Sequence, residues 1–164
     1  MAQADYYLKL DGIDGESSDD KHKGEIELLS FTLGGQHSGT GASGSGGSGT
    51  GRVQVHDFVI TKKTDKASPK LFLAFTSHQH IKKAELSCRK AGGKQDDYLK
   101  ITLTDVVVTR YNKTGAAGGP HVIPTEQVSL NFAKIEMEYK EQKPDGSLGG
   151  SVKAGYDVKQ QKAV

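Results

Sequence analysis

The chain has 164 residues, which is enough for a single domain with a real hydrophobic core. Hydrophobic residues make up 34% of it and glycine contributes 21 residues, nearly twice the usual frequency of ~7%, as expected of a loop-rich β protein. A net charge of +2 gives no bias toward nucleic acid, and no apolar run reaches the ~18 residues that would favour membrane insertion.

Two further features concern the compartment. No segment resembles a secretory signal peptide, so we expect a soluble protein that is made in the cytoplasm. Cys88 is the single cysteine, which excludes an intramolecular disulfide. It lies between polar neighbours in the sequence LSC, which favours a core position on a strand over a reactive thiol.

The first segment predicts a short strand, an acidic turn and a longer strand. Alternation of apolar residues indicates strands over Asp5–Leu10 and Glu25–Gly34. Between them, Asp11–Asp20 is rich in Asp, Gly and Ser, which favour turns because glycine tolerates positive φ and Asp or Ser bond to their own backbone. The acidic run lacks the ligand spacing of a calcium loop, so we expect a solvated hairpin turn or a contact between protomers.

A Gly/Ser-rich loop follows, over residues 36–51. Its core, Ser38–Gly51, has no apolar anchor and no phosphate-binding pattern, since Arg52 stands where Lys and then Ser or Thr would be needed. Such a composition is typical of a flexible linker or insert. The alternative is a long loop that becomes ordered only against a neighbouring protomer.

The rest of the chain predicts strands and one helix. Ser68 is a candidate N-cap and Pro69 suits the first helical position, so Lys70–Ser77 should form a helix that carries Leu71, Phe72, Ala74 and Phe75 toward the core. The alternation predicts the remaining strands over Arg52–Lys62, Lys82–Lys90, Asp97–Tyr111, Glu126–Lys140 and Val152–Val158.

Several of these strands lose their alternation phase part-way. Ile26 and Leu28 share one face, whereas Leu29, Phe31 and Leu33 take the other. Similar switches occur within Arg52–Lys62 and near Ala133. A one-residue slip indicates a β-bulge or a strand end that is buried on both faces, the first typical of a small curled barrel and the second of an oligomer.

Candidate catalytic and metal-binding residues are few. His78 and His80 could meet one metal on a strand, but they follow the predicted helix end and no Cys or acidic residue completes a site, so polar groups near free helix carbonyls are the preferred interpretation. No nucleophile signature appears, and we expect neither a cofactor nor catalysis.

The order of these features resembles one known family. The stretch Leu8–Leu33 followed by a glycine-rich excursion is similar to the start of hemolysin-coregulated proteins, the tube subunits of bacterial type VI secretion. The resemblance continues in order through TDKASPKL (Thr64–Leu71), AELSCRKAGGK (Ala84–Lys94), YLKITLTDVVVT (Tyr98–Thr109), VSLNFAKIEMEY (Val128–Tyr139) and QKPDGSLGGSVKAGYDVK (Gln142–Lys159).

The resemblance implies a mainly β fold, a compact β-barrel of two sheets with one short flanking helix, in a single domain over residues 1–164. It also implies hexameric rings stacked as the inner tube, with a contractile sheath outside, a spike at the tip and effector proteins in the lumen. Export would need no cleaved signal. Enzymatic activity would come with an added C-terminal domain, and the sequence ends at Val164. Two alternatives remain: a phage-type tail tube protein and a monomeric ligand-binding β-barrel.

The resemblance also names candidate site residues. The lumen strand of the family falls on Glu25–Gly34, where Ser30 and Thr32 present small hydroxyls opposite an apolar face, although an ordinary outer barrel face is the alternative. The inter-protomer loop would comprise Ser38, Gly39, Thr40, Gly41, Ala42, Ser43, Gly44, Ser45, Gly46, Gly47, Ser48, Gly49, Thr50 and Gly51.

Overall fold

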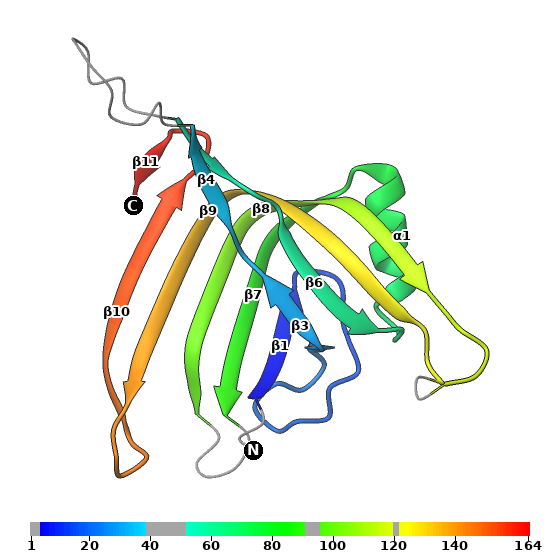
Figure 1. Ribbon diagram of the computed structural model, residues 1–164, viewed down its shortest axis with the longest axis horizontal. Helices are drawn as coiled ribbons and strands as arrows, with labels where there is room; N and C mark the ends of the chain where they lie inside the picture. Colours follow the sequence, from blue (N-terminus) through cyan, green and yellow to red (C-terminus); the bar gives the residue numbers. More distant parts are fainter. Residues whose placement is uncertain (1–3, 39–51, 91–95, 120–121) are drawn as a thin grey trace.

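The computed structural model describes residues 4–38, 52–90, 96–119 and 122–164. Within this part the chain is mainly β, with one short helix (Figure 1). The elements are β1 (Ala4–Leu10), β2 (Ile26–Leu28), β3 (Ser30–Thr32), β4 (Gly35–Ser38), β5 (Arg52–Val55), β6 (Phe58–Lys63), α1 (Ser68–Ser77), β7 (His80–Lys90), β8 (Asp97–Thr114), β9 (Thr125–Gln142), β10 (Leu148–Asp157) and β11 (Lys162–Ala163).

Most strands belong to one antiparallel sheet in the order β11-β10-β9-β8-β7-β1-β2. The edge of β9 opposite β8 has two partners: β6 pairs with its first half and β10 with its second half. β3 in turn pairs with β6. The sheet therefore forks at β9, and β3 and β6 cross in front of the other strands in Figure 1.

The phase switch at Leu29 marks a change of strand partner. β2 pairs with β1, whereas β3 pairs with β6, and the Leu29 backbone N–H donates to the Thr61 carbonyl at 2.7 Å. The predicted strand Glu25–Gly34 is therefore divided into β2 and β3. Leu29 is 48% exposed, so its expected place on the core face is wrong. Phe31 and Leu33 do pack against the core from partly buried positions.

The predicted strand Arg52–Lys62 is also divided. β5 pairs with β4 in a separate two-stranded ribbon, and β6 returns to the main sheet. The third switch, near Ala133 in β9, is matched by a switch at the paired position of β8. Ile135 pairs with Leu103 and Phe132 pairs with Val106, and all four residues are buried although they are three positions apart on each strand. Since both strands change phase together, their pairing is kept.

The expected barrel is only partly confirmed. The mainly β fold with a flanking helix is as predicted, but the strand ladders do not close into a barrel. β2 and β3 connect the β1 edge to β6 as one stretch of chain that changes partner, without a continuous ladder. The large side chains Leu8, Phe58, Leu86, Ile101 and Leu130 fill the space that the curled sheet encloses, each at most 1% exposed.

The helix α1 covers one end of this core. Leu71 and Ala74 are fully buried and Phe75 is partly buried, as predicted. Phe72 instead is 53% exposed and lies edge-on against Tyr111. Ser68 is the first helical residue rather than the N-cap; Ala67 takes that position, and the Ser68 hydroxyl accepts a hydrogen bond from the Asp65 backbone N–H at 3.0 Å.

Candidate functional site

A face of polar side chains extends across β3, β6, β9 and β8. Residues that are directly opposite in paired strands point to the same side of a sheet. Two rows follow from the register: Ser30, Thr61, Gln127 and Asn112; and Thr32, Val59, Ser129 and Arg110. We call these eight residues the polar face; seven have polar side chains, and Val59 is the apolar exception.

Alternation along each strand explains why this face is polar. Phe58 and Ile60 of β6 and Val128 and Leu130 of β9 are buried in the core. Their neighbours in the sequence point the other way. Ser30 and Thr32, which the sequence predicts on one solvated face, are both exposed and separated by the half-buried Phe31.

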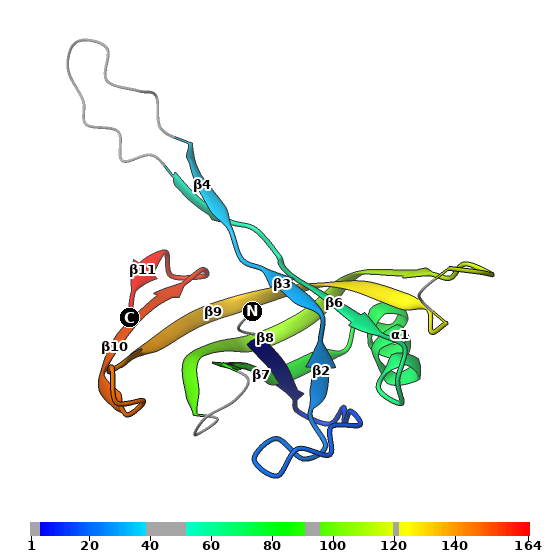
Figure 2. The same ribbon diagram turned by 60° about the horizontal axis from the view of Figure 1, so that its bottom comes forward.

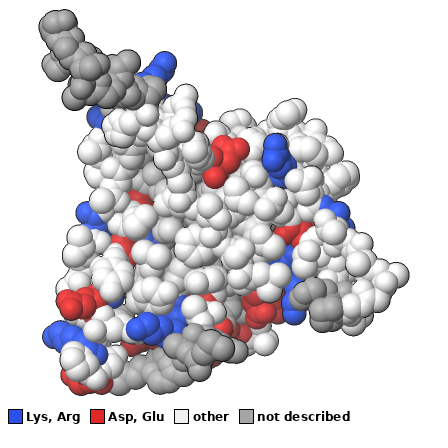
Figure 3. All heavy atoms as spheres, in the orientation of Figure 1, with Lys and Arg blue, Asp and Glu red and all other residues white. Residues whose placement is uncertain are grey.

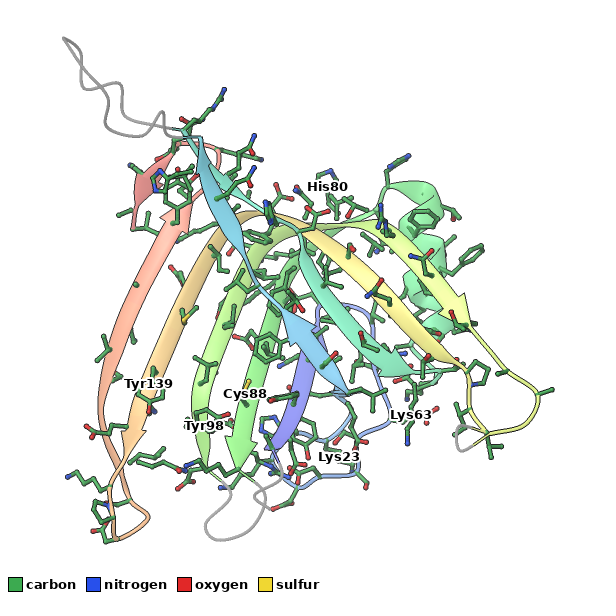
Figure 4. All side chains as sticks on the ribbon, viewed as in Figure 1. Lys23, Lys63, His80, Cys88, Tyr98 and Tyr139 are labelled. Atoms are coloured by element: carbon green, nitrogen blue, oxygen red, sulfur yellow. The ribbon has the colours of Figure 1, made fainter. Side chains whose placement is uncertain are left out.

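Charge is sparse on this surface. Figure 3 shows mostly uncharged atoms in the middle of this view, over β3, with one acidic and one basic side chain toward the upper end and more charged side chains along the lower rim. Arg110 is the charged member of the polar face, and Lys63 lies at the end of β6, in the next row with Thr125 (Figure 4). Such a surface offers hydrogen-bonding groups of low bulk.

A β-bulge orients Arg110. The register between β8 and β9 shifts between Val108 and Arg110. The bulged residue, Thr109, is exposed and its hydroxyl donates to the Asp57 carboxylate at 2.5 Å. Asn131 donates to the same carboxylate at 3.0 Å. Bulges of this kind redirect side chains, and here the two neighbours Thr109 and Arg110 are both exposed.

The predicted inter-protomer loop is reached through the ribbon of β4 and β5, which projects away from the main sheet (Figure 2). Ser38 belongs to β4 and pairs with Arg52, so this residue and Gln36 and His37 form a strand rather than loop. Residues 39–51 of the predicted loop lie outside the described residues. The assignment of this loop to a neighbouring protomer stays a prediction.

Cys88 has the core position that the sequence predicts. Its side chain is 0% exposed, and burial raises the pKa of the thiol to about 12 (Figure 4). Since the thiolate is the reactive form of cysteine, this thiol is inert.

His78 and His80 have separate structural roles. His78 adopts a left-handed conformation with φ 55° and ends α1, its backbone N–H donating to the Ala74 carbonyl. His80 begins β7, and its Nδ1 lies 2.8 Å from the Asp105 carboxylate, which also accepts a hydrogen bond from Lys159. His80 and Lys159 lower the pKa of Asp105. Across the residues that the structure describes, no group of three or more His, Cys, Asp or Glu side chains is arranged to hold a metal ion.

The acidic turn is anchored in a way that sequence reasoning missed. Asp19 binds the guanidinium of Arg89, which is 3% exposed and also donates to the Tyr7 hydroxyl at 2.8 Å. Arg89 holds the pKa of Asp19 below its usual value. The turn is therefore not merely solvated but fixed to β7 and β1. No local signal identifies this pair, because 70 residues separate its members.

His22 forms a second set of contacts that fix the same turn. Its ring stacks on Tyr7 with centroids 4.5 Å apart, and its nitrogens face the carboxylates of Glu25 and Asp97, the latter at 2.9 Å. The side chain is 6% exposed, so this contact joins the turn to the start of β8 inside the protein.

A second buried polar network joins β6, β9, β8 and α1. Lys62 is 0% exposed, and its ammonium lies 3.0 Å from the Glu126 carboxylate and 2.8 Å from that of Asp65. Tyr111 donates to Glu126 at 2.8 Å. Although burial opposes ionisation, hydrogen bonds from Ser68, Tyr111 and Lys62 keep the pKa of Glu126 low. A signal was present, since alternation places Lys62 on the same side of β6 as Phe58 and Ile60.

Comparison with known proteins identifies the family. The model of the family "Type VI secretion system effector, Hcp" matches residues 7–139. The chain belongs to the Hcp family. It is 42% identical over 158 residues to Protein hcp1 of Pseudomonas aeruginosa, which covers 95% of this chain and 96% of that protein.

Further relatives agree with this membership. The Major exported protein of Pseudomonas aeruginosa is 30% identical over 95 residues, covering 54% of this chain and 55% of its own. A solved structure described as a type six secretion system protein superposes with a TM-score of 0.93 at 34% identity, covering 99% of this chain and 100% of that one.

As an Hcp protein, the chain is a secreted tube protein of the type VI secretion system. This decides among the alternatives that the sequence left open, a secretion tube, a phage tail tube and a ligand-binding barrel. The Hcp family is a family of structural, secreted tube proteins. In the described part of the chain, no helix combines the length and hydrophobicity needed to cross a bilayer.

Proposed function

We propose that this Hcp protein assembles into hexameric rings that stack into the inner tube, and that the polar face lines the lumen, where it carries and stabilises effector proteins. The contractile sheath would surround the tube and the spike would cap it. The protein would then leave the bacterial cytoplasm with its cargo, without a cleaved signal. The polar face is the observation that carries this proposal.

The chemistry of the polar face suits a lumen. A wall that must hold different proteins and release them needs solvated groups that form individually weak hydrogen bonds. Seven of its eight members are uncharged, and its exposed members include Ser30, Thr32, Gln127 and Asn112. A strongly apolar wall would hold cargo too tightly, because each buried apolar side chain contributes about 1.5–3 kcal/mol.

Other surfaces support contact between copies. Tyr139 and Val152, neighbours on β9 and β10, are 47% and 70% exposed, and Met137 beside them is 38% exposed. In addition, β8 pairs with β9 along one edge as far as Thr114. On its other edge, the residues after Val107 have no strand partner within the described part of the chain. Exposed apolar groups and unpaired strand edges are features that assembly buries.

The mass of the purified protein in solution tests the ring. Light scattering on a size-exclusion column at micromolar concentration should give six times the mass of the chain, and electron microscopy should show closed rings. A monomer at this concentration would contradict the proposal.

Thr32→Arg tests the lumen assignment. The bulky cation should leave the ring intact, because Thr32 is exposed in the protomer, but it should narrow the lumen and reduce the amount of co-purified effector. Lys70→Arg on α1 is the matched control at an exposed site away from the polar face. Intact rings that retain effector at the unaltered level would show that β3 does not line the lumen.

A further inference from the structure

Two exposed cations, Arg110 on the polar face and Lys63 in the next row, have no ion-pair partner in the described part of the chain. Arg110 is exposed, and among the described residues its guanidinium has no hydrogen bond or ion pair. Lys63, one row along on β6, is also exposed, and its ammonium has no such contact in the described part of the chain. Lys113 of β8 does have a partner, since its ammonium lies 3.2 Å from the Glu126 carboxylate.

The nearby Asp57 carboxylate forms no ion pair with Arg110 or Lys63 in the described part of the chain. Asp57 is directed to Thr109 and Asn131, and both of its oxygens are occupied by hydrogen bonds of 2.5 and 3.0 Å. The bulge at Thr109 produces this separation, since it places a hydroxyl toward Asp57 and leaves Arg110 free at the next position. The arrangement leaves Arg110 as an exposed positive group on a face whose seven other members are uncharged.

From this arrangement we infer that the lumen face selects carried proteins with an acidic surface, and that Arg110 is the residue that contacts their carboxylates. The inference rests on the proposed function, because ring closure would bring one Arg110 from each protomer around a common channel. A guanidinium binds a carboxylate through two parallel hydrogen bonds. Positive charges that line a confined channel reinforce one another's electrostatic field.

The same face does not favour nucleic acid. Single strands bind to aromatic side chains that stack on the bases and to a dense track of cations. The polar face has no aromatic member and one charged member. Protein carboxylates are therefore the better match.

The test measures binding of labelled peptides to the full-length protein. Fluorescence anisotropy would compare poly-glutamate with poly-glutamine, and oligothymidylate would represent nucleic acid. We expect poly-glutamate to bind best and to weaken as NaCl is added. Arg110→Gln should weaken it about fivefold, as for loss of an exposed charge-assisted contact, and Arg110→Lys should weaken it less. Lys70→Gln removes the same charge from α1 and should have no effect.

Light scattering on each variant separates the possible failures. If the wild-type protein forms no ring, both the proposed function and this inference fail. If rings form but bind poly-glutamate no better than poly-glutamine, or if Arg110→Gln binds it as tightly as wild type, this inference alone is overturned. Tighter binding of oligothymidylate that depends on Arg110 would also overturn it, in favour of nucleic acid.

Discussion

At the residue scale, Arg89 determines the position of the acidic turn. Its guanidinium lies over the Tyr7 ring, with Cζ 4.9 Å from the centroid, and binds the Asp19 carboxylate. Asp19 additionally accepts hydrogen bonds from the backbone N–H groups of Lys21 and His22. One carboxylate therefore fixes both the local shape of the turn and its attachment to β7.

Replacing Asp19 should change how stability depends on pH. Arg89 lowers the pKa of Asp19 in the folded protein, so the unfolded chain binds a proton more readily. The resulting stability is complete above the unfolded-state pKa of about 3.9 and is lost as the pH falls through the lower folded value. Asp19→Asn should lower the free energy of unfolding at neutral pH by about 2–3 kcal/mol and flatten the acid side of the profile.

Urea unfolding between neutral and acidic pH checks this prediction. Asp20→Asn, at the exposed neighbouring position, is the control and should keep the wild-type profile. An Asp19→Asn profile as steep in acid as that of the wild type would show that the pair does not contribute.

At the scale of elements, the Lys62 network joins three elements of the fold: β6, β9 and α1. Lys62 of β6 contacts Glu126 of β9, and its ammonium also donates to Ser68 at the start of α1 at 3.2 Å. Paired charges in the core give little net stability compared with apolar residues, but a single unpaired charge is costly. The network therefore constrains how β6, β9 and α1 meet.

Lys62→Met should be strongly destabilising. It leaves Glu126 buried with Ser68, Tyr111 and Lys113 as remaining partners, so we expect a loss of about 3 kcal/mol, at the lower end for a broken buried pair. The double variant Lys62→Met, Glu126→Leu removes both charges and should regain most of that loss. Urea unfolding measures both, and a double variant that is less stable than Lys62→Met would contradict the interpretation.

At the scale of the whole molecule, the β4–β5 ribbon and the helix α1 lie at different ends of the main sheet. The ribbon of β4 and β5 leaves one end of the molecule, and α1 lies at the other (Figures 1 and 2). A ring subunit needs different surfaces for its two neighbours. The exposed apolar groups of β9 and β10 and the unpaired part of β8 are candidates for such surfaces.

Deletion of Ala42–Ser48 should separate folding from assembly. Ordering a loop costs roughly 1–2 kcal/mol per residue, so a segment without apolar anchors gains order most readily against a neighbour. The shortened protein should keep the circular dichroism and thermal unfolding of the wild type, yet form weaker or unstacked rings in light scattering and electron microscopy. Rings that assemble as in the wild type would show that this loop is dispensable.

The sequence by itself determined the local features. Alternation located most strands to within a few residues, Ser30 and Thr32 were correctly expected on one solvated face, and the order of motifs indicated the Hcp family. Alternation also indicates a buried position for Lys62, which is in phase with Phe58 and Ile60. These features depend on a residue and its near neighbours, so their patterns are visible in the chain.

Only the tertiary structure decided which segments meet. The partner change at Leu29, the fork at β9 and the joining of Arg110 and Thr32 in one row depend on pairing between distant strands. The attachment of Asp19 to Arg89 spans 70 residues. Such pairings are selected by packing and burial over the whole sheet rather than by local propensity, so no short pattern specifies them.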